Sequence, residues 1–191
     1  MHSRITRIAA RTAVAAAALL ITGGGRTFAP PPGPISLLKA TPRTLSEGAW
    51  RAAQKTAITG VASRDKKTLT FRAKTVHLVV HTGPENDMLS YRIAGLRNPT
   101  LVLPRGAVLN ILFVNTDDDM LHDLRFTTQR APFPMQPDPK QSLGTTPLRH
   151  RTETTYYSEQ FTLRAAPGTY TYLCTVKGHA KGGMFGTLIV R

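Results

Sequence analysis

The sequence of 191 residues contains a single cysteine, Cys174, so the chain cannot form an internal disulfide. It is also poor in acidic residues, with 11 Asp and Glu against 25 Lys and Arg and a formal net charge of +14. The basic residues are scattered between short apolar runs and are not interleaved with exposed aromatic residues, which argues against a nucleic-acid partner. Such a surface suits acidic partners or an anionic membrane surface, and the scarcity of carboxylates also suits a protein that works at low pH.

The sequence has no apolar run long enough to cross a bilayer, which takes roughly 20 residues. The apolar run over 12–22 follows Arg4, Arg7 and Arg11 and ends in three glycines. A charged segment followed by a short apolar one is typical of an export signal. We therefore expect residues 1–25 to be an export signal and the protein to be periplasmic, with an uncleaved N-terminal membrane anchor as the alternative.

Prolines crowd the next stretch, and residues 26–43 are expected to form a stiff, extended linker. The folded domain is expected over 44–191. A capping box opens this domain, because Thr44 precedes Glu47 by three residues and good helix formers follow up to Gly60. The pattern predicts one N-terminal helix.

Short runs rich in Val, Leu, Thr and aromatic residues fill most of the domain, and Gly, Pro, Asn or Asp separate most of them. Many short strands at this spacing are typical of an all-β sandwich or barrel. A proline-rich stretch over 130–147 is expected to run irregularly over the surface and to cover one end of the sandwich. The predicted strands are 68–72, 75–81, 89–94, 100–103, 107–115, 123–128, 156–163, 169–173 and 187–190.

The last two predicted strands flank a loop that carries metal-binding side chains at equal spacing. Cys174, His179 and Met184 follow one another at five-residue intervals, and Gly178 and Gly183 lie just before two of them. Glycine permits the backbone angles that such a turn requires. A trigonal His2Cys site with a weak axial Met is typical of a blue-copper electron-transfer centre. A lone buried cysteine that packs as a small hydrophobic residue is the plainer alternative, but it leaves the histidine and the methionine unexplained.

This ligand set needs a second histidine from elsewhere in the chain. His77 and His81 lie on one predicted strand, where a rise of about 3.3 Å per residue separates them by roughly 13 Å, too far to share an ion. His150 lies among arginines in a predicted loop, and His2 lies in the predicted signal. His122, at the start of a predicted strand, is therefore the candidate for the second imidazole ligand.

Several segments resemble the rusticyanin family of cupredoxins, in the same order along about 44–191. The resemblance implies a Greek-key β-sandwich with one N-terminal helix and one copper ion. It also implies that Asn115 ties the two ligand-bearing loops together near the copper. The implied ligands are His122, Cys174, His179 and Met184. The segments that carry the resemblance are 74–77, 98–101, 113–116 and 168–186, which contains C-x4-H-x4-M.

One position departs from the family pattern. The family generally has a small hydroxyl residue after the first ligand histidine, whereas this sequence has Asp123 after His122. In rusticyanin that hydroxyl is linked to a high reduction potential and to acid stability. An ionised carboxylate near the copper favours Cu(II), so we expect Asp123 to lower the potential.

These features predict an exported electron carrier, a monomer, and not an enzyme. The expected partners are respiratory redox proteins such as cytochromes c and a terminal oxidase, in an acidophilic iron- or sulfur-oxidising chain. The edge of His179 is the expected point of electron exit. The alternative is a copper-binding subunit of a terminal oxidase or a copper-delivery protein. A multicopper enzyme is disfavoured because the sequence has no H-x-H pair, and a structural zinc site because Met184 would then serve no purpose.

Overall fold

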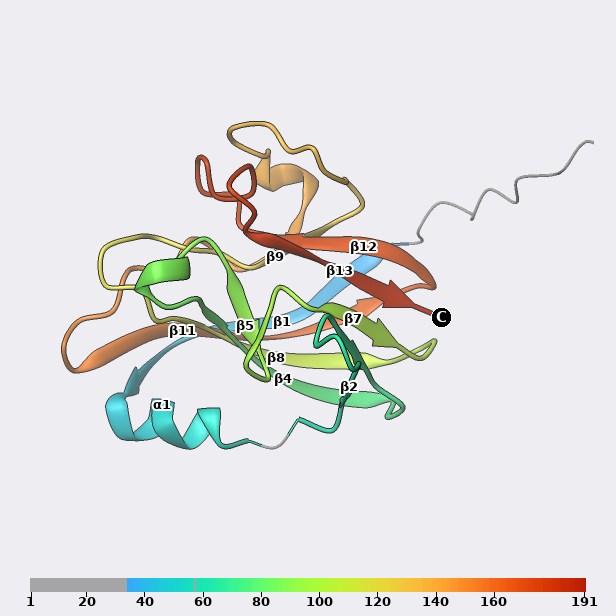
Figure 1. Ribbon diagram of the computed structural model, residues 1–191, viewed down its shortest axis with the longest axis horizontal. Coiled ribbons are helices and arrows are strands. Elements are labelled where there is room, and N and C mark those ends of the chain that lie inside the picture. The colour runs from blue at the N-terminus through green and yellow to red at the C-terminus, as the bar shows by residue number, and fades with distance from the viewer. Residues whose placement is uncertain (1–33, 57) are drawn as a thin grey trace, which may run out of the picture.

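Apolar side chains alternate with more polar ones along the strands, which is the pattern of a sheet with one buried face. In the strand Val108–Asn115, for example, Leu109, Ile111 and Phe113 are fully buried and the residues between them are half-buried. The computed structural model describes residues 34–56 and 58–191. It shows two sheets packed face to face, with one helix at the periphery (Figure 1). The predicted all-β sandwich with one helix is confirmed.

Each sheet mixes parallel and antiparallel neighbours. The first has six strands in the order β1 (Ile35–Ser46), β11 (Thr155–Ala165), β8 (Val108–Asn115), β4 (Thr75–Thr82), β5 (Tyr91–Ile93) and β6 (Leu96–Arg97). The second has seven in the order β10 (Leu143–Gly144), β9 (Arg125–Thr127), β12 (Gly168–Leu173), β13 (Phe185–Val190), β7 (Thr100–Leu103), β3 (Thr68–Thr70) and β2 (Val61–Ala62). The helix α1 spans Glu47–Gln54, and the 3-10 turns are η1 (Glu85–Asp87) and η2 (Pro139–Gln141).

Aromatic rings join the two sheets across the core. Tyr91 of the first sheet packs edge-on against Tyr172 of the second, with ring centroids 5.7 Å apart. Phe126 of the second sheet contacts Phe161 of the first at 6.2 Å. All four rings are buried, and burying one large apolar side chain contributes about 1.5–3 kcal/mol. This core fixes the distance between the sheets and hence the position of the loops at their ends.

The N-terminal part of the domain differs from the prediction. Residues 35–43, which were expected in the linker, form most of β1, which pairs with β11 along its whole length. Half-buried Ile35 and Leu37 pack against the core, so this segment is part of the sandwich. The helix begins at Glu47 instead of at a cap on Thr44, because Ser46 is the N-cap and its hydroxyl accepts a hydrogen bond from the backbone of Ala49 (3.3 Å).

The predicted export signal at 1–25 and the first part of the predicted linker, 26–33, lie outside the described residues. Over 34–56 and 58–191 the structure contains no helix with the length and apolar character needed to cross a bilayer.

All nine predicted strands are present, with boundaries shifted by a few residues. β1 and three two-residue strands, β2, β6 and β10, were not predicted. The stretch 130–147 is irregular apart from η2 and β10, and it covers the loop between β12 and β13: the backbone carbonyl of Met135 accepts a hydrogen bond from Gly178 (2.6 Å). The predicted cover over one end of the sandwich is confirmed.

Candidate metal centre

The loop between β12 and β13 is closed by its own backbone. Cys174 donates its backbone N–H to the carbonyl of Met184 (3.1 Å), and Met184 donates to the carbonyl of His179 (3.0 Å). Gly178 and Gly183 have φ of +88° and +106°, the left-handed region that favours glycine. These bonds and turns direct the side chains of Cys174, His179 and Met184 toward one end of the sandwich.

Strand pairing brings His122 to the same place. β9 and β12 are antiparallel with Leu173 opposite Arg125, so the residues just before β9 lie beside those just after β12. A second contact holds His122 from the other side, where it forms an isolated β-bridge with Leu148. Its backbone donates to the carbonyl of Leu148 (3.3 Å) and accepts from the N–H of Leu148 (2.8 Å). His122 is thus fixed by its own backbone pairing with Leu148 and placed near the end of β12 by the pairing of β9 with β12.

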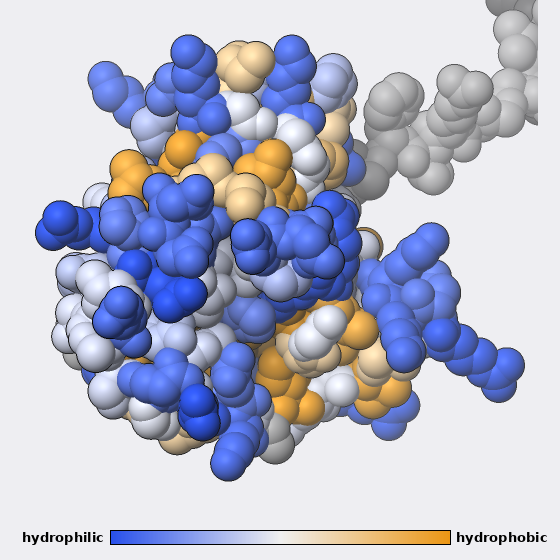
Figure 2. All heavy atoms as spheres, turned by 60° about the vertical axis from the view of Figure 1, so that its left-hand side comes forward, coloured by the Kyte–Doolittle hydropathy of each residue, from blue (hydrophilic) through white to orange (hydrophobic). Residues whose placement is uncertain are grey.

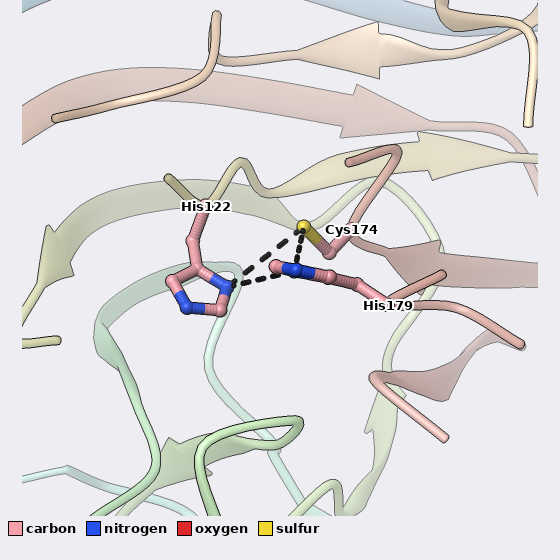
Figure 3. A group of neighbouring side chains, drawn as sticks. All are labelled: His122, Cys174 and His179. Atoms are coloured by element: carbon pink, nitrogen blue, oxygen red, sulfur yellow. Dashed lines mark hydrogen bonds between the residues drawn. The ribbon is translucent and has the colours of Figure 1, made fainter. Parts of the chain in front are cut away.

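Three donor atoms converge at this point (Figure 3). Sγ of Cys174 lies 3.4 Å from Nδ1 of His179 and 4.0 Å from Nδ1 of His122, and the two Nδ1 atoms are 3.2 Å apart. An ion at the centre of such a triangle, about 2.0 Å from each nitrogen and about 2.3 Å from the sulfur, places the donors roughly 3.5–3.7 Å apart. The three side chains therefore fit one metal ion of that size.

Met184 adds a fourth donor. Its side chain is fully buried, and Sδ lies 3.2 Å from Nδ1 of His122. A thioether is a weak, soft ligand, so its presence beside a thiolate and two imidazoles favours copper over a hard cation such as magnesium. The structure thus brings together the side chains of all four predicted ligands.

Burial sets the protonation of the donors. Burial lowers the pKa of His122 to about 4, although a hydrogen bond with Asp117 acts in the opposite direction. Burial also lowers the pKa of His179 and raises that of the Cys174 thiol. Burial thus favours the neutral form of both imidazoles, which is the form that ligation requires, and it also favours the protonated thiol, whose proton a metal ion would have to displace.

Asp123 ties the two ligand loops together. Its carboxylate accepts the backbone N–H of Thr175 at Oδ1 (2.7 Å) and the hydroxyl of Thr175 at Oδ2 (2.5 Å). Its own backbone N–H points at Sγ of Cys174 (3.5 Å). Asp123 is fully buried, and burial raises the pKa of its carboxyl, while the bonds from Thr175 oppose that shift. Asp123 directly follows His122 in the sequence, and its partner Thr175 directly follows Cys174, so this contact joins the two loops beside the predicted ligands.

Asn115 has a different role from the one that the resemblance implied. Its amide nitrogen donates to the carbonyls of Met120, Leu148 and Arg149 (2.9–3.1 Å). It therefore ties the loop before His122 to the segment at 148–149 and not to the loop of Cys174. The tie between the ligand loops is made by Asp123 instead, because register places it opposite Thr175.

Asp117 is a neighbour of the site that the sequence analysis did not single out. Oδ2 of its carboxylate lies 3.2 Å from Nε2 of His122, and its side chain is only 3% exposed. The sequence shows three consecutive aspartates over 117–119, but it does not indicate which one turns inward. Within 34–56 and 58–191 the other histidines lie away from the centre, as predicted: His81 packs against Trp50 with ring centroids 5.1 Å apart, and His77 and His150 are exposed. His2 lies outside the described residues.

Comparison with known proteins identifies similar chains. No protein-family model matches the sequence. It is 33% identical to rusticyanin of Acidithiobacillus ferrooxidans over 156 residues, which cover 76% of this chain and 98% of the relative. It is 35% identical to rusticyanin of Acidithiobacillus ferridurans over 137 residues, which cover 70% of this chain and 71% of the relative.

Solved structures show the same likeness. A structure of rusticyanin from Thiobacillus ferrooxidans superimposes with a TM-score of 0.73 at 31% identity, covering 81% of this chain and 99% of the other. A structure described as that of the copper protein rusticyanin has a TM-score of 0.73 at 29% identity, and the match covers 79% of this chain and 98% of the other.

Proposed function

The chain belongs to the rusticyanin family of cupredoxins, and from that membership we propose that it carries single electrons on one copper ion held by its three buried donors and Met184. The observation that supports this most is the convergence of two imidazole nitrogens and a thiol sulfur within 4.0 Å of one another. Copper supplies the one-electron chemistry by alternating between Cu(I) and Cu(II). All other contributions come from the protein.

The protein's first contribution is rigidity. His122 is held by two backbone bonds to Leu148, and Cys174 by a backbone bond to Met184. The donors keep their positions when an electron arrives or leaves, so little rearrangement opposes the transfer. Fast exchange with a partner is the expected consequence.

His179 offers the route for the electron. It is 7% exposed, the largest exposed fraction among the four ligands, while the other three are fully buried. Two exposed apolar residues flank this end: Leu121, which precedes His122 and is 46% exposed, and Met135, which is 48% exposed and touches the loop at Gly178. Figure 2 shows hydrophobic side chains grouped among hydrophilic ones on the side of the molecule that it brings forward. We place the docking of redox partners at this end.

The partners, the compartment and the pathway are also part of the proposal. The export-signal pattern in 1–25 supports a periplasmic location, and respiratory proteins such as cytochromes c and a terminal oxidase fit the role of donor and acceptor. The relatives come from Acidithiobacillus, which supports a place in an acidophilic iron- or sulfur-oxidising chain.

The visible absorption spectrum of the copper-loaded protein tests this function. We expect an intense thiolate-to-copper band that is absent in Cys174→Ser, and rapid loss of the band when a reduced cytochrome c is added. A protein that binds copper with this band but exchanges no electrons with the cytochrome, and instead releases copper to a chelating acceptor, would be a delivery protein. Copper uptake that is the same in Cys174→Ser would reject the site itself.

A further inference from the structure

The two ring nitrogens of His122 have different neighbours. Nδ1 faces the sulfur of Cys174 and Nδ1 of His179, whereas Nε2 faces Oδ2 of Asp117 at 3.2 Å. We propose that Asp117 is a positioning residue for the copper centre: its carboxylate accepts a hydrogen bond from Nε2–H of His122, fixes the ring, and favours oxidised copper over reduced copper. This inference rests on the proposed function, because it assigns a role at the same site.

The donor geometry fixes the tautomer. An imidazole that binds a metal through Nδ1 must leave that nitrogen unprotonated, so the proton of the neutral ring lies on Nε2. Oδ2 of Asp117 is the acceptor within hydrogen-bonding distance of that proton. A histidine ligand whose other N–H is held by a carboxylate is a stronger base and is restricted in rotation.

The carboxylate is itself held in place. Oδ1 of Asp117 accepts the backbone N–H groups of Asp119 and Met120, both at 3.0 Å. The backbone N–H of Asp117 donates to the side chain of Asn115 (3.1 Å). Over 34–56 and 58–191, His122 is the one basic side chain that pairs with Asp117. Oδ1 therefore shapes the loop, whereas Oδ2 faces His122.

The two imidazole rings of the site have different surroundings. His122 is fully buried and has a carboxylate behind its ring, whereas His179 is 7% exposed and no side chain in the described part of the chain bonds its Nε2. A negative charge behind a ligand stabilises Cu(II), which has the higher charge, more than Cu(I). Because the contact is shielded from water, salt screens it only weakly.

The expected size follows from other metal sites, where loss of such a partner costs about 10–100-fold in metal affinity. We expect Asp117→Asn to weaken Cu(II) binding by about that factor and Cu(I) binding by less. A tenfold difference between the two oxidation states corresponds to a rise of about 59 mV in the reduction potential, since one electron is transferred.

Asp118→Asn is the matched control. It removes the same charge from the next residue, but the Asp118 side chain is 68% exposed and pairs with Arg151 at 3.3 Å, not with a ligand. The two variants and the wild type are loaded with copper as full-length proteins. Their potentials are measured by redox titration, and their Cu(I) and Cu(II) affinities by competition with chelators. The potential depends on a ratio of affinities, so it remains informative if Asp117→Asn lowers stability.

A second measurement needs no variant. In the Cu(I) wild-type protein, nitrogen NMR should show a proton on Nε2 of His122 that exchanges slowly with water. The inference is supported if this proton is present and if the potential rises in Asp117→Asn by clearly more than in Asp118→Asn. Equal shifts in the two variants, or an unprotonated Nε2, would overturn it. Failure of the wild type to bind copper would instead reject the proposed function.

Discussion

The carboxylate of Asp123 should stabilise the fold even without copper, because it joins the two loops that carry the ligands. Asp123→Ala removes the acceptor for two hydrogen bonds from Thr175, which is only 5% exposed and would be left with a buried N–H and hydroxyl. The backbone bonds of Asp123 to Cys174 and from Tyr91 do not depend on the side chain. The substitution therefore isolates the side-chain tie.

The size of the effect follows from these two bonds. A hydrogen bond contributes about 1 kcal/mol between neutral groups and up to about 3 kcal/mol when one group is charged. Burial raises the pKa of Asp123 and the bonds from Thr175 oppose the shift, so we take a value between these limits for each bond. Asp123→Ala should then reduce the free energy of unfolding by about 3 kcal/mol and the melting temperature by roughly 6–12 °C.

The assay is urea unfolding of the copper-free protein, followed by fluorescence of Trp50, the only tryptophan and a buried one. Asp118→Ala serves as control, and its exposed site should change the free energy by less than about 0.5 kcal/mol. Asp123→Asn keeps one acceptor, so its loss in the free energy of unfolding should lie between those of Asp123→Ala and Asp118→Ala. If Asp123→Ala unfolds at the same urea concentration as Asp118→Ala, the tie does not contribute and the reasoning is wrong.

Three further predictions concern the potential, the pH dependence of stability and the start of the helix. Asp123→Ser should raise the reduction potential, since it removes a carboxylate beside a ligand, and a redox titration that shows no change or a fall would contradict this. Glu159 is 5% exposed, its Oε2 has no hydrogen-bond partner within the described residues, and burial raises its pKa. The contribution of Glu159 to stability is therefore complete below about pH 4, near its pKa in the unfolded chain, and is lost as the pH rises through its pKa in the folded protein. Glu159→Gln should flatten this fall in the free energy of unfolding, measured by urea unfolding from pH 4 to 8. An unchanged slope of the free energy against pH would refute this prediction. Ser46→Ala should cost about 1 kcal/mol in the free energy of unfolding because it removes the N-cap, whereas Thr44→Ala should cost little. A cost for Thr44→Ala as large as that for Ser46→Ala would contradict the assignment of the cap to Ser46.

The sequence predicts the C-terminal half of the site because its geometry is local. Cys174, His179 and Met184 lie in one loop between two strands, and their spacing and glycines carry the signal. His122 could be found by exclusion of the other histidines. Its place beside Cys174 depends on the pairing of Leu173 with Arg125, which no local pattern reveals.

The features that were missed depend on tertiary contacts. β1 contains Pro42, which has no N–H to donate and therefore indicates a linker, but an edge strand tolerates it, and β1 is the edge of its sheet. The helix starts two residues later than its capping box suggests because Thr44 and Leu45 still pair with β11. Among three adjacent aspartates, only contact with His122 distinguishes Asp117.

The most direct test of the account is a crystal structure of the copper-loaded protein with an anomalous difference map at the copper edge. The account predicts one peak about 2.0 Å from Nδ1 of His122 and of His179 and about 2.3 Å from Sγ of Cys174, with Sδ of Met184 at a longer distance. A peak bound elsewhere, or one that lacks Cys174 among its ligands, would contradict it.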